Sequence, residues 1–540
     1  RMQPIFSRNG KETPEPVKAT ITGTLPAWLQ GTLLRNGPGM FSVGETSYNH
    51  WFDGMSLIHS FTFKDGEVYY RSKFLRSDTY KKNIKADRIV VSEFGTMAYP
   101  DPCKSIFTKV FSYLSNTIPD FTDNCLINIV NYGGDFYATT ETNYLHKIDP
   151  YTLETIEKED YRKYIAVNLA TSHPHYDKEG NTYNMGTTIV NFGKPKYTIF
   201  KVPSQAAGNE DNANPGLRNL ESLCSVPCRS ALYPSYFHSF GMTENYIIFI
   251  EQPFKLDILK LATAYYRGVN WAGCLKFEAN DVTLIHVIDR KTQKTLSSKF
   301  YADALVVFHH VNAYEEKEHI VFDIIAYKDS SLYDMFYLAN LQQESETFIE
   351  KHKLSSPPVC KRFVLPLGSD QDAPADKNLV NLLNTTATAV KQKDGSVYCS
   401  PEEICEGVEL PRINYESNCR KYRYFYATRV EWKPFPTKVA KVDVATKTML
   451  EWEEEDCWPA EPVFVPSPNA VEEDDGIILS SIISTDPQKP PFLLILNAKD
   501  FQEIARASVN TTVHLDLHGH FIPQQAEEQV RKHVGFNSQC

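Results

Sequence analysis

A short pattern recurs four times along the chain, and it constrains the fold of the chain more than any other feature of the sequence. Each copy has an apolar residue, then Asp or Asn, then Thr or Asp, and finally a second apolar residue. The copies are IDPYTLETI (148–156), IDRKTQKTL (288–296), VDVATKTML (442–450) and LNAKDFQEI (496–504). In such a stretch a strand ends at the Asp or Asn, whose side chain can bond the backbone of a turn, and a second strand follows. Each copy therefore predicts a β-hairpin.

The spacing of these copies indicates a repeat architecture. Asp149, Asp289, Asp443 and Asn497 lie 140, 154 and 54 residues apart, which we interpret as three, three and one units of roughly 50 residues. A period of ~40–50 residues built from four strands is the signature of a β-propeller. The 540 residues leave room for about seven such blades plus insertions. The predicted fold class is therefore all-β, and the alternative is ordinary hairpin chemistry repeated by accident.

Composition excludes some classes of function. The net charge of −11 leaves no basic surface of the kind that nucleic-acid binding requires. The 11 cysteines are scattered, and a chain of this length does not depend on disulfides, so we expect the cytosol. No apolar run approaches the ~20 residues of a membrane span. The first residues, RMQPIFSRNGKETPEPV, lack the apolar segment of a signal peptide, and nothing indicates an obligate protein partner.

Two insertions break the strand pattern. CKSIFTKVFSYL (103–114) and FKLDILKLATAYYRGVNWAGCLKF (254–277) have apolar residues near helical spacing. The second carries four basic residues against one Asp, a combination that suits transient docking on an anionic lipid surface. We predict that segments at about 103–120 and 254–277 form a helical cap. A cap that only packs on the propeller is the alternative to lipid docking.

Histidines are concentrated in four motifs. NLATSHPHYD contains His173 and His175, SYFHSFG contains His238, VVFHHVNAYE contains His309 and His310, and TTVHLDLHGHFIP contains His514, His518 and His520. Taken singly, each could be a hydrogen-bonded core residue. In a propeller, however, the inner strands of different blades converge on one axis and can each contribute one ligand. The spacings of 65, 71 and 209 residues from His173 through His238 and His309 to His518 fit such a site, since 209 is about three times 70. A local H-x-H pair, from HPH or HGH, plus one distant ligand is the alternative.

A site built only from imidazoles has chemical consequences. Neutral nitrogen ligands suit iron, copper, zinc and nickel rather than magnesium or calcium. Metal-bound histidines usually donate their other N–H group to a carboxylate or a carbonyl. Glutamates in apolar or small-residue surroundings are candidates for that role, namely Glu141 in TTETN, Glu409 in GVELPRINY and Glu461 in WPAEPVFVP. A buried glutamate without a partner is costly, so each should have one.

Together these motifs make the chain recognisable, because it resembles the carotenoid cleavage oxygenases from end to end. Matching stretches include LQGTLLRNGPGM, YNHWFDGMSLIHSF, RIVVSEFGTMAYPDPCK, NLATSHPHYD, VVFHHVNAYEE and CWPAEPVFVP. The resemblance implies a single oxygenase domain over residues 1–540, folded as a seven-bladed β-propeller with a helical cap over its top face. It also implies one Fe²⁺ on the axis, held by His173, His238, His309 and His518.

The same resemblance implies a second layer around the metal. Glu141 would stand behind His238, Glu409 behind His309 and Glu461 behind His518, whereas His173 would lack such a partner. His175, His310, His514 and His520 match no ligand position. Tyr236 and Tyr327 are candidates for steadying electron-poor intermediates with their aromatic faces or for shaping the substrate tunnel, with ordinary packing as the alternative.

The resemblance implies an activity as well. The expected enzyme is a non-haem Fe²⁺ dioxygenase that uses O2 to cleave the central 15,15′ double bond of β-carotene into two molecules of all-trans-retinal, which forms vitamin A. A retinyl-ester isomerohydrolase or an off-centre carotenoid cleaver would share the metal and its ligands, and only overall likeness favours central cleavage. A non-catalytic carotenoid-binding protein is a third alternative. Cys103, in PDPCK, is a candidate acylation site by resemblance to the isomerohydrolase branch, with an ordinary free cysteine as the alternative.

Overall fold

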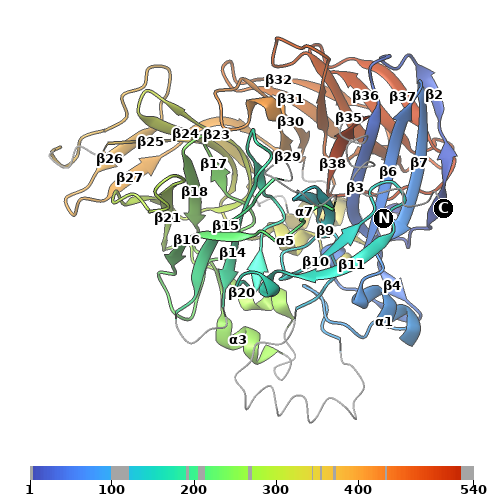
Figure 1. The fold of residues 1–540 in the computed structure, drawn as a ribbon, viewed down its shortest axis with the longest axis horizontal. Coiled ribbons are helices and arrows are strands. Elements are labelled where there is room, and N and C mark those ends of the chain that lie inside the picture. The colour runs from blue at the N-terminus through green and yellow to red at the C-terminus, as the bar shows by residue number, and fades with distance from the viewer. Residues whose placement is uncertain are drawn as a thin grey trace.

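The structure is a computed structural model. It describes residues 4–98, 121–189, 194–204, 213–264, 270–342, 345–352, 356–368, 373–431 and 435–524. Within these residues, seven sheets of four to six strands follow one another along the chain. They stand side by side around a common centre (Figure 1). The predicted all-β, seven-bladed propeller is therefore confirmed.

The first four blades comprise these strands, with the innermost strand first. Blade 1 has β38 (His518–Pro523), β3 (Gly31–Met40), β6 (Met55–Lys64), β7 (Glu67–Phe74) and β1 (Thr13–Lys18). Blade 2 has β8 (Asn128–Tyr132), β9 (Asp135–Thr139), β10 (Tyr144–Ile148) and β11 (Thr155–Asp160). Blade 3 has β12 (Leu169–Ala170), β13 (His175–Tyr176), β14 (Thr182–Thr188), β15 (Lys196–Val202) and β16 (Glu221–Pro227). Blade 4 has β17 (Gly241–Met242), β18 (Tyr246–Glu251), β21 (Val282–Asp289) and β22 (Phe300–Asp303), extended by β27 (Val397–Ser400) and β26 (Thr388–Lys391).

The last three blades complete the ring. Blade 5 has β23 (Val306–Glu316), β24 (His319–Tyr327), β25 (Val359–Pro366) and β28 (Glu402–Glu406). Blade 6 has β29 (Val408–Arg412), β30 (Tyr424–Arg429), β31 (Lys438–Asp443) and β32 (Thr448–Glu453). Blade 7 has β33 (Cys457–Pro459), β34 (Val463–Pro466), β35 (Gly476–Ser484), β36 (Phe492–Asn497), β37 (Glu503–Ser508) and β2 (Thr20–Gly23). Apolar side chains fill the space between blades, as where Ile478 and Leu494 of blade 7 pack with Tyr426 of blade 6.

Both ends of the chain take part in closing the propeller. The C-terminal strand β38 pairs with β3 in blade 1, with His518 opposite Asn36. The N-terminal strand β2 pairs with β37 in blade 7, with Thr20 opposite Ser508. Blade 1, with β3, β6 and β7, and blade 7, with β2, β36 and β37, lie at the right of Figure 1. Because each of these blades mixes strands from both termini, the ring has no open seam between blades 7 and 1.

The recurring pattern forms the same turn in every copy. Asp149, Asp289 and Asp443 each accept hydrogen bonds from the backbone N–H groups two and three residues later, and Asn497 accepts one from Lys499. The fourth residue after each has a left-handed backbone, with φ from 60° to 64°, and its N–H donates back to the Asp or Asn carbonyl. This geometry reverses the chain between the third and fourth strands of blades 2, 4, 6 and 7. The prediction of strand–turn–strand units is confirmed.

The predicted unit count between the copies is wrong, however. The copies lie two, two and one blades apart rather than three, three and one. Insertions lengthen the intervening blades, since β26 and β27 of blade 4 arise from a segment between strands of blade 5, and three short helices follow β24. These helices are α5 (Leu332–Met335), α6 (Leu338–Leu341) and α7 (Ser345–His352). The assumed length of about 50 residues per unit is therefore too short for the blades in the middle of the chain.

The predicted cap is only partly helical. Within 254–277 the structure has a two-stranded sheet of β19 (Phe254–Leu256) and β20 (Leu275–Phe277), enclosing α3 (Ile258–Ala262) and the 3₁₀ helix η4 (Trp271–Cys274). The start of the segment predicted to be helical, Phe254–Leu256, is therefore a strand, and the helical parts are Ile258–Ala262 and Trp271–Cys274. The segment at about 103–120, with Cys103, lies outside the described residues.

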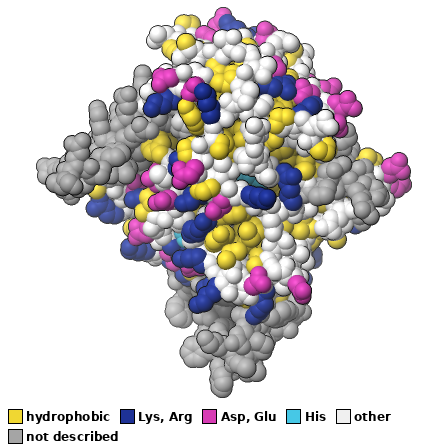
Figure 2. All heavy atoms as spheres, turned by 90° about the vertical axis from the view of Figure 1, so that its right-hand side faces the viewer, with side chains coloured by type: hydrophobic (Ala, Val, Ile, Leu, Met, Phe, Trp, Pro, Cys, Tyr) yellow, Lys and Arg dark blue, Asp and Glu magenta, His cyan; other side chains and the backbone are white. Residues whose placement is uncertain are grey.

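The remaining short elements are α1 (Asp78–Ala86), η1 (Pro4–Phe6), η2 (Trp51–Asp53), η3 (Tyr161–Lys163), η5 (Tyr415–Ser417), β4 (Ser42–Val43) and β5 (Thr46–Ser47). No helix in the described ranges is long and apolar enough to cross a membrane. The nine cysteines within those ranges are all free thiols. On the face in Figure 2, acidic and basic side chains are interspersed rather than gathered by sign.

Candidate metal centre

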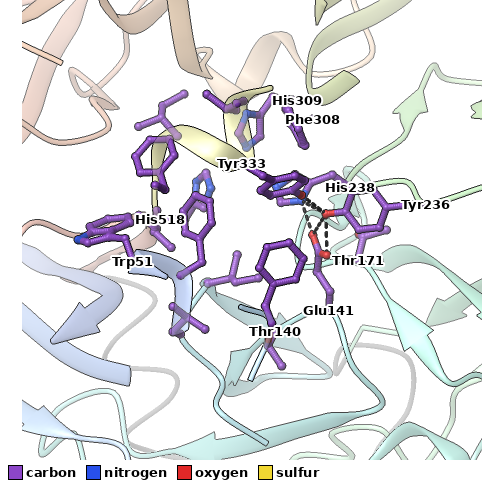
Figure 3. Close-up of a pocket in the computed structure, with 18 of the residues that line it drawn as sticks. Trp51, Thr140, Glu141, Thr171, Tyr236, His238, Phe308, His309, Tyr333 and His518 are labelled. Carbon is purple, nitrogen blue, oxygen red and sulfur yellow. Dashed lines mark hydrogen bonds and ion pairs between the residues drawn. The ribbon is translucent and has the colours of Figure 1, made fainter. Parts of the chain in front are cut away.

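Four histidines from four different blades meet at the centre of the propeller. His173 lies between β12 and β13, His238 just before β17, His309 on β23 and His518 at the start of β38. One nitrogen of each lies within 4.8 Å of the corresponding nitrogens of the others. Figure 3 shows three of these imidazoles, those of His238, His309 and His518, around one space. The spacings of 65, 71 and 209 residues correspond to one, one and three blades, as predicted.

The imidazoles are close enough to act on one ligand. The Nε2 atoms of His173 and His238 lie 3.0 Å apart. The His173 ring centroid lies 4.5 Å from that of His518 and 5.0 Å from that of His309, and the His309 and His518 centroids are 5.2 Å apart. The local alternative, in which HPH or HGH supplies two ligands, is not what the cluster contains.

Three of the four histidines are fixed by a glutamate. His238 Nδ1 bonds to Glu141 Oε1, His309 Nδ1 donates to Glu409 Oε2 over 2.7 Å, and His518 Nδ1 donates to Glu461 Oε2 over 2.6 Å. These are the pairs that the family resemblance implied. Among the described residues no carboxylate bonds to His173. Because each Nδ1 carries its proton toward a carboxylate, each Nε2 presents a lone pair to the centre. The Nε2 atom of His309 is buried there without a hydrogen-bond partner.

Tyrosine hydroxyls hold two of the glutamates. The Tyr236 hydroxyl donates to Glu141, 2.7 Å from Oε2, and accepts a bond of 2.8 Å from the Tyr333 hydroxyl (Figure 3). The Tyr327 hydroxyl donates to Glu409 Oε1 over 2.8 Å. The Tyr236 hydroxyl also lies 3.3 Å from His238 Nδ1, whereas Tyr327 is connected to His309 through Glu409. The rings of the two tyrosines pack against Phe254 and Phe308, respectively, and both line the cavity described below; a role of their aromatic faces toward an intermediate stays a prediction.

Glu461 sits instead in a network of buried charges. Its Oε1 accepts hydrogen bonds from Arg35 Nη1 at 2.9 Å and Arg412 Nη1 at 2.8 Å. Arg35 also donates to Asp516 Oδ1 over 2.6 Å. Burial alone would raise the pKa of Glu461, but His518 and Arg412 hold it below its usual range. Burial would likewise raise the pKa of Asp516, but the Arg35 guanidinium and the other groups that stabilise the carboxylate lower it to about 2. Both carboxyls are therefore ionised at neutral pH.

The other four histidines of the sequence motifs lie outside the cluster and make other contacts. His175 Nε2 donates to the Phe240 carbonyl over 2.8 Å, and His514 Nε2 donates to the Leu57 carbonyl over 2.9 Å. His310 lies beside the centre with both ring nitrogens buried and without hydrogen-bond partners, and His520 packs against Phe136. None of the four belongs to the cluster.

An apolar cavity of about 310 Å³ leads to the imidazoles. Its wall is mainly aromatic and aliphatic, with Trp51, Phe94, Phe121, Trp271, Leu275 and Phe308 among the lining residues. His238, His309 and His518 belong to its wall (Figure 3), as do Tyr236, Tyr327 and Tyr333. Such a cavity favours an apolar ligand whose reacting part lies against the cluster.

Four residues that contribute to this centre were not predicted from the sequence, namely Arg35, Arg412, Asp516 and Tyr333. A weak signal existed for two of them. Asp516 shares the alternation of the DLHG strand with His518, and Arg35 interrupts an otherwise apolar run in LLRNG. Tyr333 lies in α5, which follows a predicted strand, and nothing local marks it.

Comparisons with known proteins agree on one family. Residues 6–523 match the family model described as retinal pigment epithelial membrane protein. The chain is 64% identical over 531 residues to the β,β-carotene 15,15′-dioxygenase of Rattus norvegicus, covering 98% of this chain and 93% of that one. It is 42% identical over 520 residues to the mitochondrial carotenoid-cleaving dioxygenase of Mustela putorius furo, covering 95% of each. Among solved structures, the cobalt-substituted apocarotenoid oxygenase of Synechocystis matches with a TM-score of 0.75 at 23% identity, covering 96% of this chain and 97% of that one.

Proposed function

This chain belongs to the family of the retinal pigment epithelial membrane protein and the carotenoid oxygenases, and we propose that it is a metal-dependent dioxygenase that cleaves β-carotene with O2 at its central 15,15′ double bond. The products are two molecules of all-trans-retinal, each of which receives one oxygen atom. The identity of 64% to central-cleaving relatives, against 42% to the other carotenoid-cleaving branch, favours this bond over an off-centre one. The observation that carries the proposal is the convergence of four imidazoles, three of which line an apolar cavity.

The donor set fits a transition-metal ion, and His173, His238, His309 and His518 would hold it. Three imidazole lone pairs, each fixed by a carboxylate behind it, would repel one another without a cation between them. The unpartnered, buried Nε2 of His309 is such an unsatisfied acceptor. All-nitrogen ligation excludes magnesium and calcium and is compatible with iron.

The surrounding charges favour a divalent ion. Arg35 and Arg412 are balanced by Glu461 and Asp516. In the described part of the chain, no Lys or Arg pairs with Glu141 or Glu409, whose partners are neutral tyrosines, their histidines and, for Glu409, the Leu410 backbone N–H. Two negative charges are thus left for the metal to neutralise. We propose Fe²⁺, which supplies the redox chemistry by which O2 reacts with a carbon–carbon double bond.

The protein's own residues would bind, orient and shield the substrate. The aromatic wall excludes water and holds an apolar polyene along the cavity, so that the bond to be cut lies beside the imidazoles. Tyr236 and Tyr327 keep Glu141 and Glu409 directed at the Nδ1–H groups of His238 and His309. We propose that these tyrosines act mainly in this way, as positioning residues. A carrier would need neither the four imidazoles nor their carboxylates.

We also propose a cytosolic protein of one domain that touches membranes transiently to collect its substrate. Support comes from Leu232, Tyr233 and Leu259, which are 45%, 44% and 57% exposed. They lie beside the cavity-lining residues of the α3 segment, since Ile258 N–H donates to the Leu232 carbonyl. The expected basic excess is smaller than the sequence indicated, because Lys255 pairs with Asp281 and Lys276 with Glu278. Docking would therefore be largely apolar.

Product analysis tests the proposal. Purified protein with Fe²⁺, O2 and β-carotene should yield retinal alone; an apocarotenal of another length, or retinol from a retinyl ester, would contradict it. His518→Gln should lose both iron and turnover. The matched control is His520→Gln, two residues away in the same motif but outside the cluster, and it should keep both.

A further inference from the structure

One polar side chain in the apolar wall has no part in the function proposed above. Glu93 lines the cavity beside Phe94 and Phe121, and its side chain is buried, with 3% exposure. Its Oε1 accepts hydrogen bonds from the hydroxyls of Thr122 at 2.6 Å and Thr79 at 3.4 Å. Its Oε2 has no hydrogen-bond partner among the described residues, and protein atoms do not enclose this oxygen completely. Oε2 is therefore open to the cavity.

The surroundings of Glu93 favour the neutral acid. Burial raises its pKa well above the usual value, and the nearby carboxyls of Asp53 and Asp123 raise it further. Asp53 is itself fully buried and takes the available donors, Gly95 N–H at 2.9 Å and the Thr96 hydroxyl at 2.6 Å. No basic side chain in the described part of the chain forms an ion pair with Glu93. A carboxylate there would face a second acid with no cation to balance it.

A neutral carboxyl group has one acceptor and one donor. Since the Thr122 hydroxyl already donates to Oε1 over 2.6 Å, that atom is the carbonyl oxygen, and the proton resides on Oε2. An O–H group facing an apolar cavity without an acceptor is an unsatisfied donor. The ligand that satisfies it must carry an oxygen atom at that point.

The position of Glu93 indicates which part of the ligand this is. The neighbouring Phe94 ring packs 5.0 Å from the Tyr333 ring, and the Tyr333 hydroxyl in turn bonds to Tyr236. Phe94, Tyr333 and Tyr236 thus form a chain of contacts that ends at His238, whereas the Glu93 carboxyl bonds to threonine hydroxyls and to none of the four histidines or their glutamates among the described residues. The bond to be cut lies at the imidazoles, so Glu93 faces a part of the polyene away from that bond.

We propose that Glu93 is a specificity-determining residue whose Oε2–H donates a hydrogen bond to an oxygen at the end of an otherwise apolar polyene. The ligand class is polyenes with a hydroxyl or carbonyl group on a terminal ring. The proposal rests on the proposed function only in taking the cavity as the polyene site. The product aldehyde is the other source of such an oxygen, but it is generated at the imidazoles rather than beside Phe94.

Two variants of matched size test the donor. Glu93→Gln keeps a donor at this position, whereas Glu93→Met fills the same space without one. The metal-loaded protein would be titrated without O2 with β-carotene and with its analogue bearing a carbonyl on one terminal ring, and Kd read from the shift of the polyene absorption band. We expect the preference for the carbonyl analogue over β-carotene to fall roughly tenfold in Glu93→Met, the worth of one hydrogen bond. Glu93→Gln should stay within about twofold of wild type.

Several outcomes would overturn the proposal. They are an unchanged preference in Glu93→Met, an equal loss in both variants, or a change in retinal affinity without a change in that preference. Melting temperature and iron content check that each variant is folded, and Glu93→Ala replaces the Met variant if it is not. Turnover of β-carotene is measured separately. Absence of turnover would contradict the proposed function. The role of Glu93 would still be decided by the binding preference.

Discussion

Replacing Glu461 with glutamine should damage both the stability and the metal affinity of this protein. Glu461 Oε1 accepts from Arg35 and Arg412, and Oε2 accepts from the Nδ1–H group of His518. A glutamine has one acceptor oxygen and one NH2 group, so it cannot satisfy donors on both sides. If its oxygen faces the arginines, its NH2 group faces His518, whose proton then moves to Nε2. That proton blocks the lone pair needed by a metal.

The magnitude follows from the charges. Without Glu461, Arg35 keeps its ion pair with Asp516, whereas Arg412 loses its only described ion-pair partner, so one positive charge is left uncompensated at the centre. Removing one partner of a buried ion pair costs about 3–5 kcal/mol of folding free energy. Losing the carboxylate behind a ligand lowers metal affinity by about 10–100-fold. Arg412 is 30% exposed, so the lower half of the energy range is expected.

A double variant separates the two effects. Adding Arg412→Met to Glu461→Gln removes the excess positive charge and should recover about 1–2 kcal/mol, but it does not restore the acceptor for His518. Denaturation midpoints would report the first effect, and iron retained after dialysis against a chelator the second. Glu454→Gln, which disturbs a half-exposed ion pair with Arg506, is the matched control. Full iron retention in Glu461→Gln with an unshifted midpoint, or a double variant less stable than the single one, would refute the reasoning.

Three further outcomes are expected. Tyr327→Phe removes a hydroxyl donor from Glu409 and should lower iron affinity about tenfold in chelator competition without unfolding the protein; an unchanged affinity would contradict the positioning role. Burial lowers the pKa of His50 to about 4 and of His514 to about 3, so the folded protein keeps them neutral while the unfolded chain binds protons below pH ~6.5. Acidifying from pH 7.5 to 5.5 should therefore cost about 1.4 kcal/mol of stability for each, and His514→Gln should flatten this dependence in urea titrations; the same slope in both proteins would count against it. Leu259→Asp, at an exposed position on α3, should reduce flotation with anionic vesicles severalfold at an unchanged melting temperature, and equal flotation would argue against docking through this segment.

Local chemistry was the part of this fold that could be predicted from the sequence. The turn at Asp149 and its three counterparts depends only on residues within five positions of each other, so its pattern is visible in the chain. Blade number between copies depends on insertions, and a spacing in residues cannot tell an added strand from an added blade. The prediction of helical structure from residue 254 onward was wrong at its start for a related reason. A short strand, Phe254–Leu256, directly precedes the short helix Ile258–Ala262 there.

The four histidines could be proposed as a set because each stands in a conspicuous motif. Arg35 and Glu461 are 426 residues apart, and Arg35 and Asp516 are 481 apart. Asp516 reaches Arg35 because β38 folds back beside β3, and Glu461 reaches it from blade 7, the neighbouring blade in the closed ring. Tyr333 reaches Tyr236 across 97 residues from a helix that the sequence did not predict. Contacts of this kind depend on ring closure rather than on local pattern.

The pairing of β38 with β3 sets the order in which the centre can be assembled during synthesis. His173, His238 and His309 emerge long before His518, which follows His173 by 345 residues. Until β38 has docked in blade 1, the nascent chain offers at most three of the four imidazoles. Iron bound by all four would then span a loop of 345 residues, and such long loops carry a large closure entropy. Full loading would thus require a completed ring, and loss of iron would weaken the attachment of the strand that was added last, β38.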